Sequence, residues 1–277
     1  MKKIFPLFLA AVLAGCNTLP NTAERLTTAQ HIASQGQLLP RQFQVQGLTL
    51  QSFLKLGKTP QHVRLYLEGD GLAYINSHTP SVDPTPMNPT ALRLAAVDGA
   101  ANVIYLARPC QYTLALQPNC AQKYWTTHRY SAEVLHAYNS LLDDLKAKYG
   151  IQTFELVGFS GGGTIAALLA ESRTDVIGLR TVAANLDVAV FTQFHHITPM
   201  THSLDPAENA ARLKSLPQLH YVGQDDSVVP AIVVRHFLEK QVTDADVVAK
   251  RLKVVQGMDH FAQWYRLWPK LLNAPLE

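Results

Sequence analysis

The 277-residue sequence has little charge, few cysteines and no visible repeat or low-complexity tract. Asp, Glu, Lys and Arg make up 16% of the chain, and the formal net charge is only +3. No basic stripe is visible, which argues against nucleic acid as a partner. Because hydrophobic residues make up 47% of the sequence, a chain of this length is expected to form one large globular domain with a proper core.

The apolar run at the N-terminus is too short to span a membrane. It extends from Ile4 to Leu13, whereas a spanning helix needs about 20 residues. Two lysines precede it, which is typical of an export signal. The stretch Leu13-Ala14-Gly15-Cys16 resembles a bacterial lipobox. The resemblance implies cleavage before Cys16 and lipidation of Cys16. Since Asn17 rather than Asp follows, it also implies an anchor in the outer membrane, facing the periplasm. An ordinary secretory peptide that ends near a cysteine is the alternative.

Only three cysteines occur in the sequence. If Cys16 carries the lipid, Cys110 and Cys120 remain in an oxidising compartment with nine residues between them. This spacing predicts a disulfide that closes a short loop. Two cysteines with no clustered histidine do not make a tetrahedral ligand set, so the sequence predicts no metal site.

Hydrophobic periodicity predicts an opening hairpin and then five alternations of strand and helix. The hairpin strands begin near Phe43 and Leu48, with Gly47 in the turn. This order is typical of the α/β class, with a mostly parallel central sheet, helices on both faces and an antiparallel N-terminal edge. In such sheets functional groups gather at the carboxyl ends of the strands, so reactive residues are expected there.

One strand-to-helix turn has the pattern Gly-x-Ser-x-Gly. The apolar run Thr153 to Val157 leads into Gly158-Phe159-Ser160-Gly161-Gly162, and a helical run follows. This context is the one that a nucleophile elbow requires. Glycines beside the serine remove Cβ atoms that would clash in so tight a turn, and the Gly161 N–H can point at a developing oxyanion. A glycine-rich turn without chemistry is the alternative.

A serine nucleophile needs a base, and the base needs an orienting acid. His260 follows the last predicted strand and is the favoured base, while His195 and His196 compete from an irregular segment. The candidate acids are Asp225 and Asp226, which directly follow a strand, and Asp187, which ends the preceding one. Each of these acids could instead cap a turn or a helix.

The ordered set Ser160, Gly223-x-x-Asp226-x-x-x-Pro230 and Asp259-His260-Phe261 resembles the alpha/beta-hydrolase superfamily. The chain is also similar to bacterial lipoproteins assigned to that superfamily without a known substrate. The resemblance implies that Asp226 is the triad acid. Many members carry His-Gly after the third strand, whereas this chain has Glu68-Gly69-Asp70-Gly71. By position, Asp70 and Gly161 would supply the two oxyanion N–H groups, and the Asp70 carboxylate is expected to point away, into a turn or toward Arg108.

These residues predict a serine hydrolase that cleaves a small-molecule ester or thioester through an acyl-enzyme, with no cofactor. A peptidase or amidase could use the same residues. A hydrolase-fold lipoprotein that acts only as a binding module is the non-enzymatic alternative.

The predicted organisation has three parts. Residues 1–15 form a signal peptide, and residues 16–40 form a polar tether to the membrane that can be helical around residues 23–33. Residues 41–277 form the domain. Within the domain, residues 185–217 form a long insertion without a clear pattern, and loops beyond about 15 residues are usually functional. We expect this insertion to cover Ser160 as a lid, together with residues 70–89, and to bind substrate through Phe191, Phe194 and His195.

Overall fold

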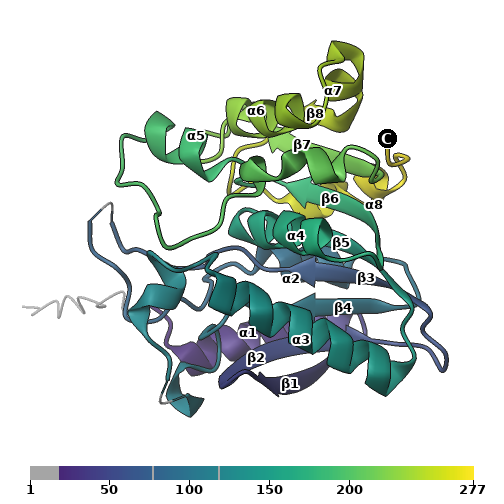
Figure 1. Cartoon of the computed structure of the whole chain (residues 1–277). Helices are drawn as coiled ribbons and strands as arrows, with labels where there is room; N and C mark the ends of the chain where they lie inside the picture. The colour runs from purple at the N-terminus through teal and green to yellow at the C-terminus, as the bar shows by residue number, and fades with distance from the viewer. Residues whose placement is uncertain (1–18, 77, 118) are drawn as a thin grey trace, which may run out of the picture.

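The computed structural model describes residues 19–76, 78–117 and 119–277. An eight-stranded sheet runs through the molecule in the order β1-β2-β4-β3-β5-β6-β7-β8 (Figure 1). Strands β3 to β8 are mutually parallel, whereas β1 and β2 are antiparallel and form the edge, as predicted. The strands are β1 (Leu39–Val45), β2 (Leu48–Lys55), β3 (His62–Leu67), β4 (Val103–Leu106), β5 (Thr153–Phe159), β6 (Val176–Val182), β7 (Gln218–Gly223) and β8 (Leu252–Val255).

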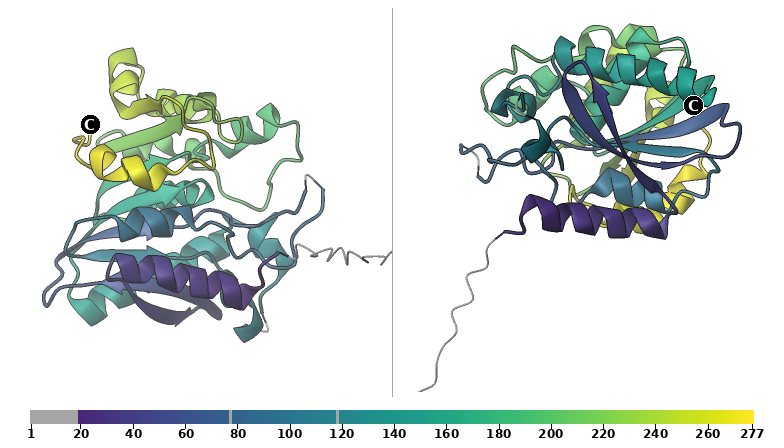
Figure 2. Two further views of the ribbon diagram at one scale, coloured as in Figure 1. Left: turned by 180° about the vertical axis from the view of Figure 1, so that it is seen from behind. Right: turned by 90° about the horizontal axis from the view of Figure 1, so that it is seen from below.

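Helices cover both faces of the sheet (Figure 1 and Figure 2). Successive strand residues point to opposite faces, so Leu65 and Tyr66 of β3 enter separate hydrophobic clusters. Helices α3, α4 and α6 bury apolar residues in one cluster, and α1, α2 and α8 in the other. The helices are α1 (Thr22–Gln35), α2 (Thr90–Ala96), α3 (Ala132–Tyr149), α4 (Gly161–Ser172), α5 (Val188–Phe194), α6 (Ala231–Gln241), α7 (Ala245–Arg251) and α8 (Trp264–Leu272).

Helix α1 corrects the predicted tether. Asn21 caps the helix, and Ala29, Ile32 and Ala33 are buried against the domain. These three residues lie at i, i+3 and i+4 and form a narrow apolar stripe that the surrounding polar residues mask in the sequence. The predicted boundary at residue 40 is therefore wrong, because the chain from Thr22 onward is part of the packed domain. The predicted signal peptide and Cys16 lie outside the described residues.

The segment 185–217 is only partly lid-like. Its first half forms α5, but its second half forms two 3₁₀ turns at Pro206–Glu208 and Ala210–Leu213. Ala207, Ala210 and Leu213 are buried in the core beside α4 and α6. The prediction of one continuous insertion over the site is therefore wrong for residues 206–213, since their apolar residues are part of the main core.

The predicted disulfide between Cys110 and Cys120 is present, with a Cα–Cα distance of 5.7 Å. It lies within the long connection from β4 to α3. Among the described residues, no helix combines the length and the apolar character needed to cross a bilayer.

Candidate active site

Ser160 occupies a sharp turn between β5 and α4. Its φ of 50° and ψ of −124° are unusual for a residue with a side chain, and such strain is typical of a nucleophile elbow. The neighbouring chain is packed too closely for side chains: a Cβ on Gly158 would lie 2.3 Å from the Gly163 Cα, and one on Gly162 would lie 2.2 Å from the Leu67 carbonyl oxygen. These glycines therefore let the elbow rest against the end of β3.

His260 lies between Ser160 and Asp226. The distance from His260 Nε2 to Ser160 Oγ is 3.1 Å, and that from His260 Nδ1 to Asp226 Oδ2 is 3.0 Å. Asp226 Oδ1 accepts hydrogen bonds from the N–H groups of Val228 and Val229 at 2.9 and 2.7 Å, which fix the carboxylate. If Nδ1 carries the proton that faces Asp226, the lone pair of Nε2 faces the serine hydroxyl, as a general base requires.

The competing residues lie elsewhere. Asp187 is fully buried and caps α5 by accepting a hydrogen bond from the Val190 N–H. Its Oδ2 lies 2.5 Å from His236 Nδ1 and 3.4 Å from Lys240 Nζ. Asp225 is exposed, and within the part of the chain that the structure describes its one hydrogen bond is from its backbone N–H to the Met258 carbonyl oxygen. Asp226 is thus the acid that faces His260, in line with the spacing argument.

Two backbone N–H groups flank Ser160, those of Asp70 and Gly161. A Cβ on Gly69 would lie 3.3 Å from the Ser160 Cβ, so the chain after β3 passes directly beside the serine. Within residues 19–76, 78–117 and 119–277, neither of the two N–H groups donates to another protein atom. Unengaged donors beside a strained serine are what an oxyanion site needs.

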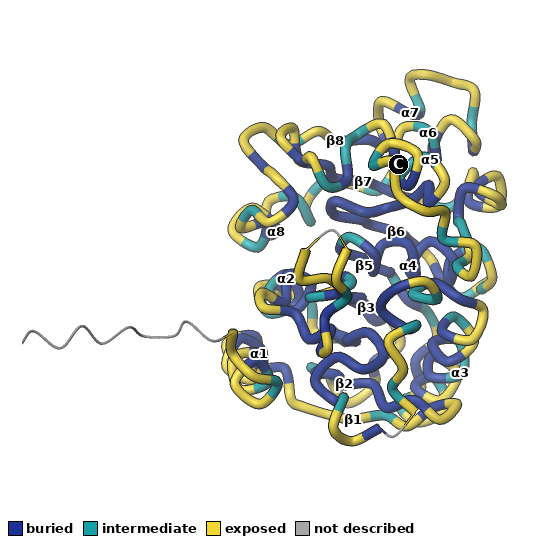
Figure 3. The backbone as a smooth tube through the Cα atoms, turned by 90° about the vertical axis from the view of Figure 1, so that its left-hand side faces the viewer, coloured by how far each residue is buried: buried dark blue, intermediate teal, exposed yellow. Residues whose placement is uncertain are grey.

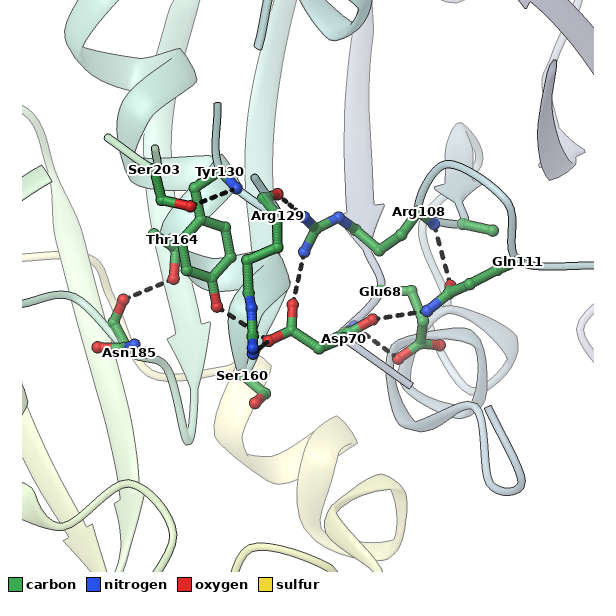
Figure 4. Close-up of polar contacts among 12 residues, drawn as sticks. Glu68, Asp70, Arg108, Gln111, Arg129, Tyr130, Ser160, Thr164, Asn185 and Ser203 are labelled. Atoms are coloured by element: carbon green, nitrogen blue, oxygen red, sulfur yellow. Dashed lines mark hydrogen bonds and ion pairs between the residues drawn. The ribbon is translucent and has the colours of Figure 1, made fainter. Parts of the chain in front are cut away.

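The Asp70 side chain lies within a cluster of two arginines and a tyrosine (Figure 4). Its Oδ1 is 2.9 Å from Arg108 Nη1, and its Oδ2 is 2.8 Å from Arg129 Nη1 and accepts a bond from Tyr130 at 3.0 Å. Burial would raise the pKa of Asp70, but the guanidinium groups of Arg129 and Arg108 outweigh it and lower this pKa below its ordinary value.

The position of this carboxylate corrects part of the prediction. The ion pair with Arg108 is as expected, but the carboxylate does not turn away from the elbow. A Cβ on Gly161 would lie 2.2 Å from Asp70 Oδ1 and 2.7 Å from the Tyr130 hydroxyl. The negative charge therefore stays beside the first residue of α4, and the two arginines offset it there.

Glu68 supports the same loop from inside the protein. Its carboxyl group accepts hydrogen bonds from the N–H groups of Gly69, Ala91 and Leu92 and from the Tyr105 hydroxyl. Burial raises the pKa of Glu68 to about 7 despite these four bonds. No spacing or periodicity singles out Arg129 or Tyr130 in the sequence. Glu68 could have been noticed as an acid at the carboxyl end of a predicted strand.

A cavity of about 320 Å³ opens above Ser160. Phe191 lines it, as predicted, together with Met87 and Phe261. Phe194 and His195 do not line it, so their predicted contact with substrate is not supported: Phe194 is half exposed, and His195 Nε2 lies 2.7 Å from the Val228 carbonyl oxygen. On the short helix α5, only the face that carries Phe191 is directed at the cavity.

No protein-family model matches this chain, and no curated protein matches it. Solved structures do match. An alpha-beta serine hydrolase homologue from Coxiella burnetii is 16% identical, with a TM-score of 0.55 over 84% of this chain and 95% of that one. Est1E from Butyrivibrio proteoclasticus is 12% identical, with a TM-score of 0.57 and coverages of 84% and 95%. An esterase from Pyrococcus furiosus is 12% identical, with a TM-score of 0.53 and coverages of 85% and 87%.

These similarities, with the strand order and the elbow, show that the chain has the alpha/beta-hydrolase fold, which confirms the predicted fold class. At such low identity the similarity shows the fold alone.

Proposed function

We propose that this protein is a serine hydrolase that cleaves carboxylic esters or thioesters. The observation that carries the proposal is the continuous contact from Ser160 Oγ to His260 Nε2 and from His260 Nδ1 to Asp226, at 3.1 and 3.0 Å. This arrangement activates a hydroxyl that is otherwise a poor nucleophile. The fold shared with a serine hydrolase homologue and an esterase supports the same class.

In the proposed reaction, Ser160 Oγ bonds to the acyl carbon while its proton moves to His260 Nε2. The carbonyl oxygen becomes an oxyanion, which accepts hydrogen bonds from the N–H groups of Asp70 and Gly161. The bond to the leaving oxygen or sulfur then breaks, and His260 returns the proton to it. A water molecule attacks the acyl-enzyme in the same way and releases the acid. Asp226 orients His260 and stabilises the imidazolium throughout.

The charge around the oxyanion position suits this step. Asp70 brings one negative charge to the elbow. Arg108 and Arg129 bring two positive charges, each within 2.9 Å of an oxygen of the Asp70 carboxylate. The cluster is therefore net positive where negative charge develops in the transition state. Without the arginines, the half-buried carboxylate of Asp70 beside the Gly161 N–H would oppose the oxyanion.

Fluorophosphonate labelling tests the proposal directly. The wild-type protein should form an adduct at Ser160, located by peptide mass mapping, and Ser160→Ala should form none. His260→Ala should fold but label far more slowly. A folded wild-type protein that stays unlabelled would reject the hydrolase and leave the binding module as the better account.

The membrane anchor is a second proposal, and it rests on the sequence of residues 2–17. Mass analysis of the N-terminal peptide from cell envelopes should find Cys16 as the first residue, with acyl groups attached, and Cys16→Ser should abolish the modification. Cleavage at another position, or an unmodified Cys16, would indicate an ordinary secretory peptide.

A further inference from the structure

Two loops beside the cavity are almost free of charge. Residues 71–89 form the part of the β3–α2 connection that follows Glu68 and Asp70. Residues 188–204 comprise α5 and the chain after it, between Asp187 and Asp205. Apart from histidines, their ionisable side chains are two: the carboxylate of Asp83 and the phenol of Tyr74. Asp83 is buried and lies 2.6 Å from Arg25 Nη2. Long exposed loops of soluble proteins normally carry charged residues, so the composition of both loops is unusual.

The same end of the molecule exposes large apolar side chains. We call six of them the apolar rim; their exposed fractions range from 40% to 86%, and they are Ile75, Val82, Met87, Phe194, Ile197 and Phe261. Met87 and Phe261 also line the cavity. The segment with Phe194 and Ile197 is held against the cavity wall through the contact between His195 and Val228. Single exposed apolar residues are ordinary, but a group around one opening marks an interaction surface.

Helix α1 begins at this end as well. The Thr22 hydroxyl lies 2.5 Å from Asp83 Oδ2, and Arg25 Nη1 donates to the Thr85 carbonyl at 2.5 Å. The start of α1 is therefore fastened to the loop that carries Ile75, Val82 and Met87. Figure 1 shows α1 beginning on the side where the parallel strands end, and Figure 3 views that side, with the loop between β3 and α2 projecting from it.

This attachment fixes where an N-terminal anchor would hold the domain. Cys16 precedes Thr22 by six positions, which is at most about 20 Å of extended chain. A lipid on Cys16 would therefore keep the bilayer surface close to the apolar rim. A domain anchored at its opposite end would instead turn the cavity away from the membrane.

We propose that the apolar rim docks on the surface of a lipid bilayer, so that the cavity opens toward the membrane and receives acyl esters of amphiphilic lipids. The docking surface follows from the uncharged loops, the exposed side chains and the position of α1. The substrate class also rests on the proposed hydrolase function. Shallow insertion of apolar side chains next to a covalent lipid supplies the two signals that stable membrane attachment needs.

A tryptophan placed in the rim reports the docking. Ile75 and Ile177 form a matched pair, because both are isoleucines with exposed fractions of 56% and 49%. Ile177 lies near the amino end of β6, at the opposite end of the sheet. The full-length protein, processed in cells, is bound to phosphatidylcholine vesicles with brominated acyl chains. Tryptophan fluorescence of Ile75→Trp should be quenched beyond that of the wild type, whereas Ile177→Trp should match the wild type. No extra quenching at position 75, or equal quenching at both, would overturn the proposal.

A kinetic comparison tests the substrate class. Ile75→Glu with Val82→Glu places two charges in the rim, at positions that do not line the cavity. Hydrolysis of a long-chain acyl ester in vesicles should fall by about tenfold or more, because the rim no longer inserts. Hydrolysis of a soluble aryl acetate should be unchanged, and Ile177→Glu should affect neither. An equal loss on both substrates, or no loss on either, would contradict lipid delivery. If the wild type hydrolyses neither substrate, the proposed function fails, while the quenching experiment still decides the docking surface.

Discussion

Asp70 Oδ1 lies 2.9 Å from Arg108 Nη1, on the loop whose backbone would hold the oxyanion. An acid at this position is acceptable only because its charge is neutralised locally. Arg129 and Tyr130 complete the neutralisation from the far end of the β4–α3 connection. The β4–α3 connection thus brings both cations, which lie on either side of the disulfide loop, to one carboxylate.

This relationship predicts a rescue. Arg129→Met should lower kcat by about tenfold to a hundredfold, because Asp70 and Arg108 alone leave the cluster with no net positive charge to stabilise the oxyanion. Adding Asp70→Asn should restore most of the loss, since the backbone N–H of residue 70 remains. The measurement is kcat on one aryl ester for the single and double variants, each checked for folding. If the losses simply add, the arginine acts in some way other than by balancing Asp70.

The three candidate acids should separate by experiment. Asp226→Asn should lower kcat by about 10⁴ with little change in KM, the scale known for the triad acid of serine proteases. Asp225→Asn should cost only a few-fold, as an exposed charge would. Asp187→Asn should keep kcat but lower Tm, because the buried carboxylate holds both the start of α5 and His236. An inactive Asp187→Asn or Asp225→Asn beside an active Asp226→Asn would reverse the assignment.

The two phenylalanines of α5 should now behave differently. Phe191 lines the cavity, whereas Phe194 belongs to the apolar rim. Phe191→Ala should shift the preference among soluble aryl esters toward longer acyl chains, because it enlarges the cavity. Phe194→Ala should leave that preference unchanged. The check is a kcat/KM profile over a chain-length series; identical profiles for all three proteins would remove Phe191 from the acyl site.

The disulfide should stabilise without taking part in chemistry. Replacing Cys110 and Cys120 by Ala together should lower the free energy of unfolding by about 2–3 kcal/mol, as expected for so short a closed loop. Since neither sulfur lies among the cavity-lining residues, kcat should remain close to that of the wild type. Denaturant unfolding and steady-state kinetics provide the two readouts, and an inactive but stable double variant would contradict this view.

The parts predictable from sequence are those with a periodic or spaced signal. Parallel strands bring their carboxyl ends to one edge, so Ser160, Asp226 and His260 could be expected to meet although up to 100 positions separate them. The glycines around Ser160 indicate that two backbone segments pack closely there. These signals depend on local geometry, which a short pattern encodes.

The missed features depend on packing between distant segments. Arg129 and Tyr130 follow no strand, and only the fold of the β4–α3 connection brings them to Asp70. The buried stripe of α1 is three small or medium residues in a polar helix, too short for a periodicity argument. The direction of Phe191 and Phe194 depends on how a helix of seven residues sits on its neighbours. Such contacts have no local sequence pattern.

Glu68 should make stability depend on pH. Its pKa is raised by burial from 4.5 to about 7 in the folded protein. Between these values the unfolded chain has released the proton and the folded chain still holds it, so stability should fall as pH rises through this window and then level off. At about 1.4 kcal/mol per pH unit, this group accounts for a fall of about 3 kcal/mol.

Glu68→Gln isolates this contribution. The amide cannot ionise, so the free energy of unfolding should fall less steeply between pH 4.5 and about 7. The absolute stability should drop, because the Leu92 N–H loses its acceptor. Glu171 provides a comparison, because burial raises its pKa to about 8. Glu171→Gln should therefore reduce the loss of stability over a pH range that extends up to about 8. Free energies of unfolding in urea across the pH range supply the slopes. A Glu68→Gln slope equal to that of the wild type would show that the carboxyl group is already ionised in the fold, and that its four hydrogen bonds outweigh the effect of burial.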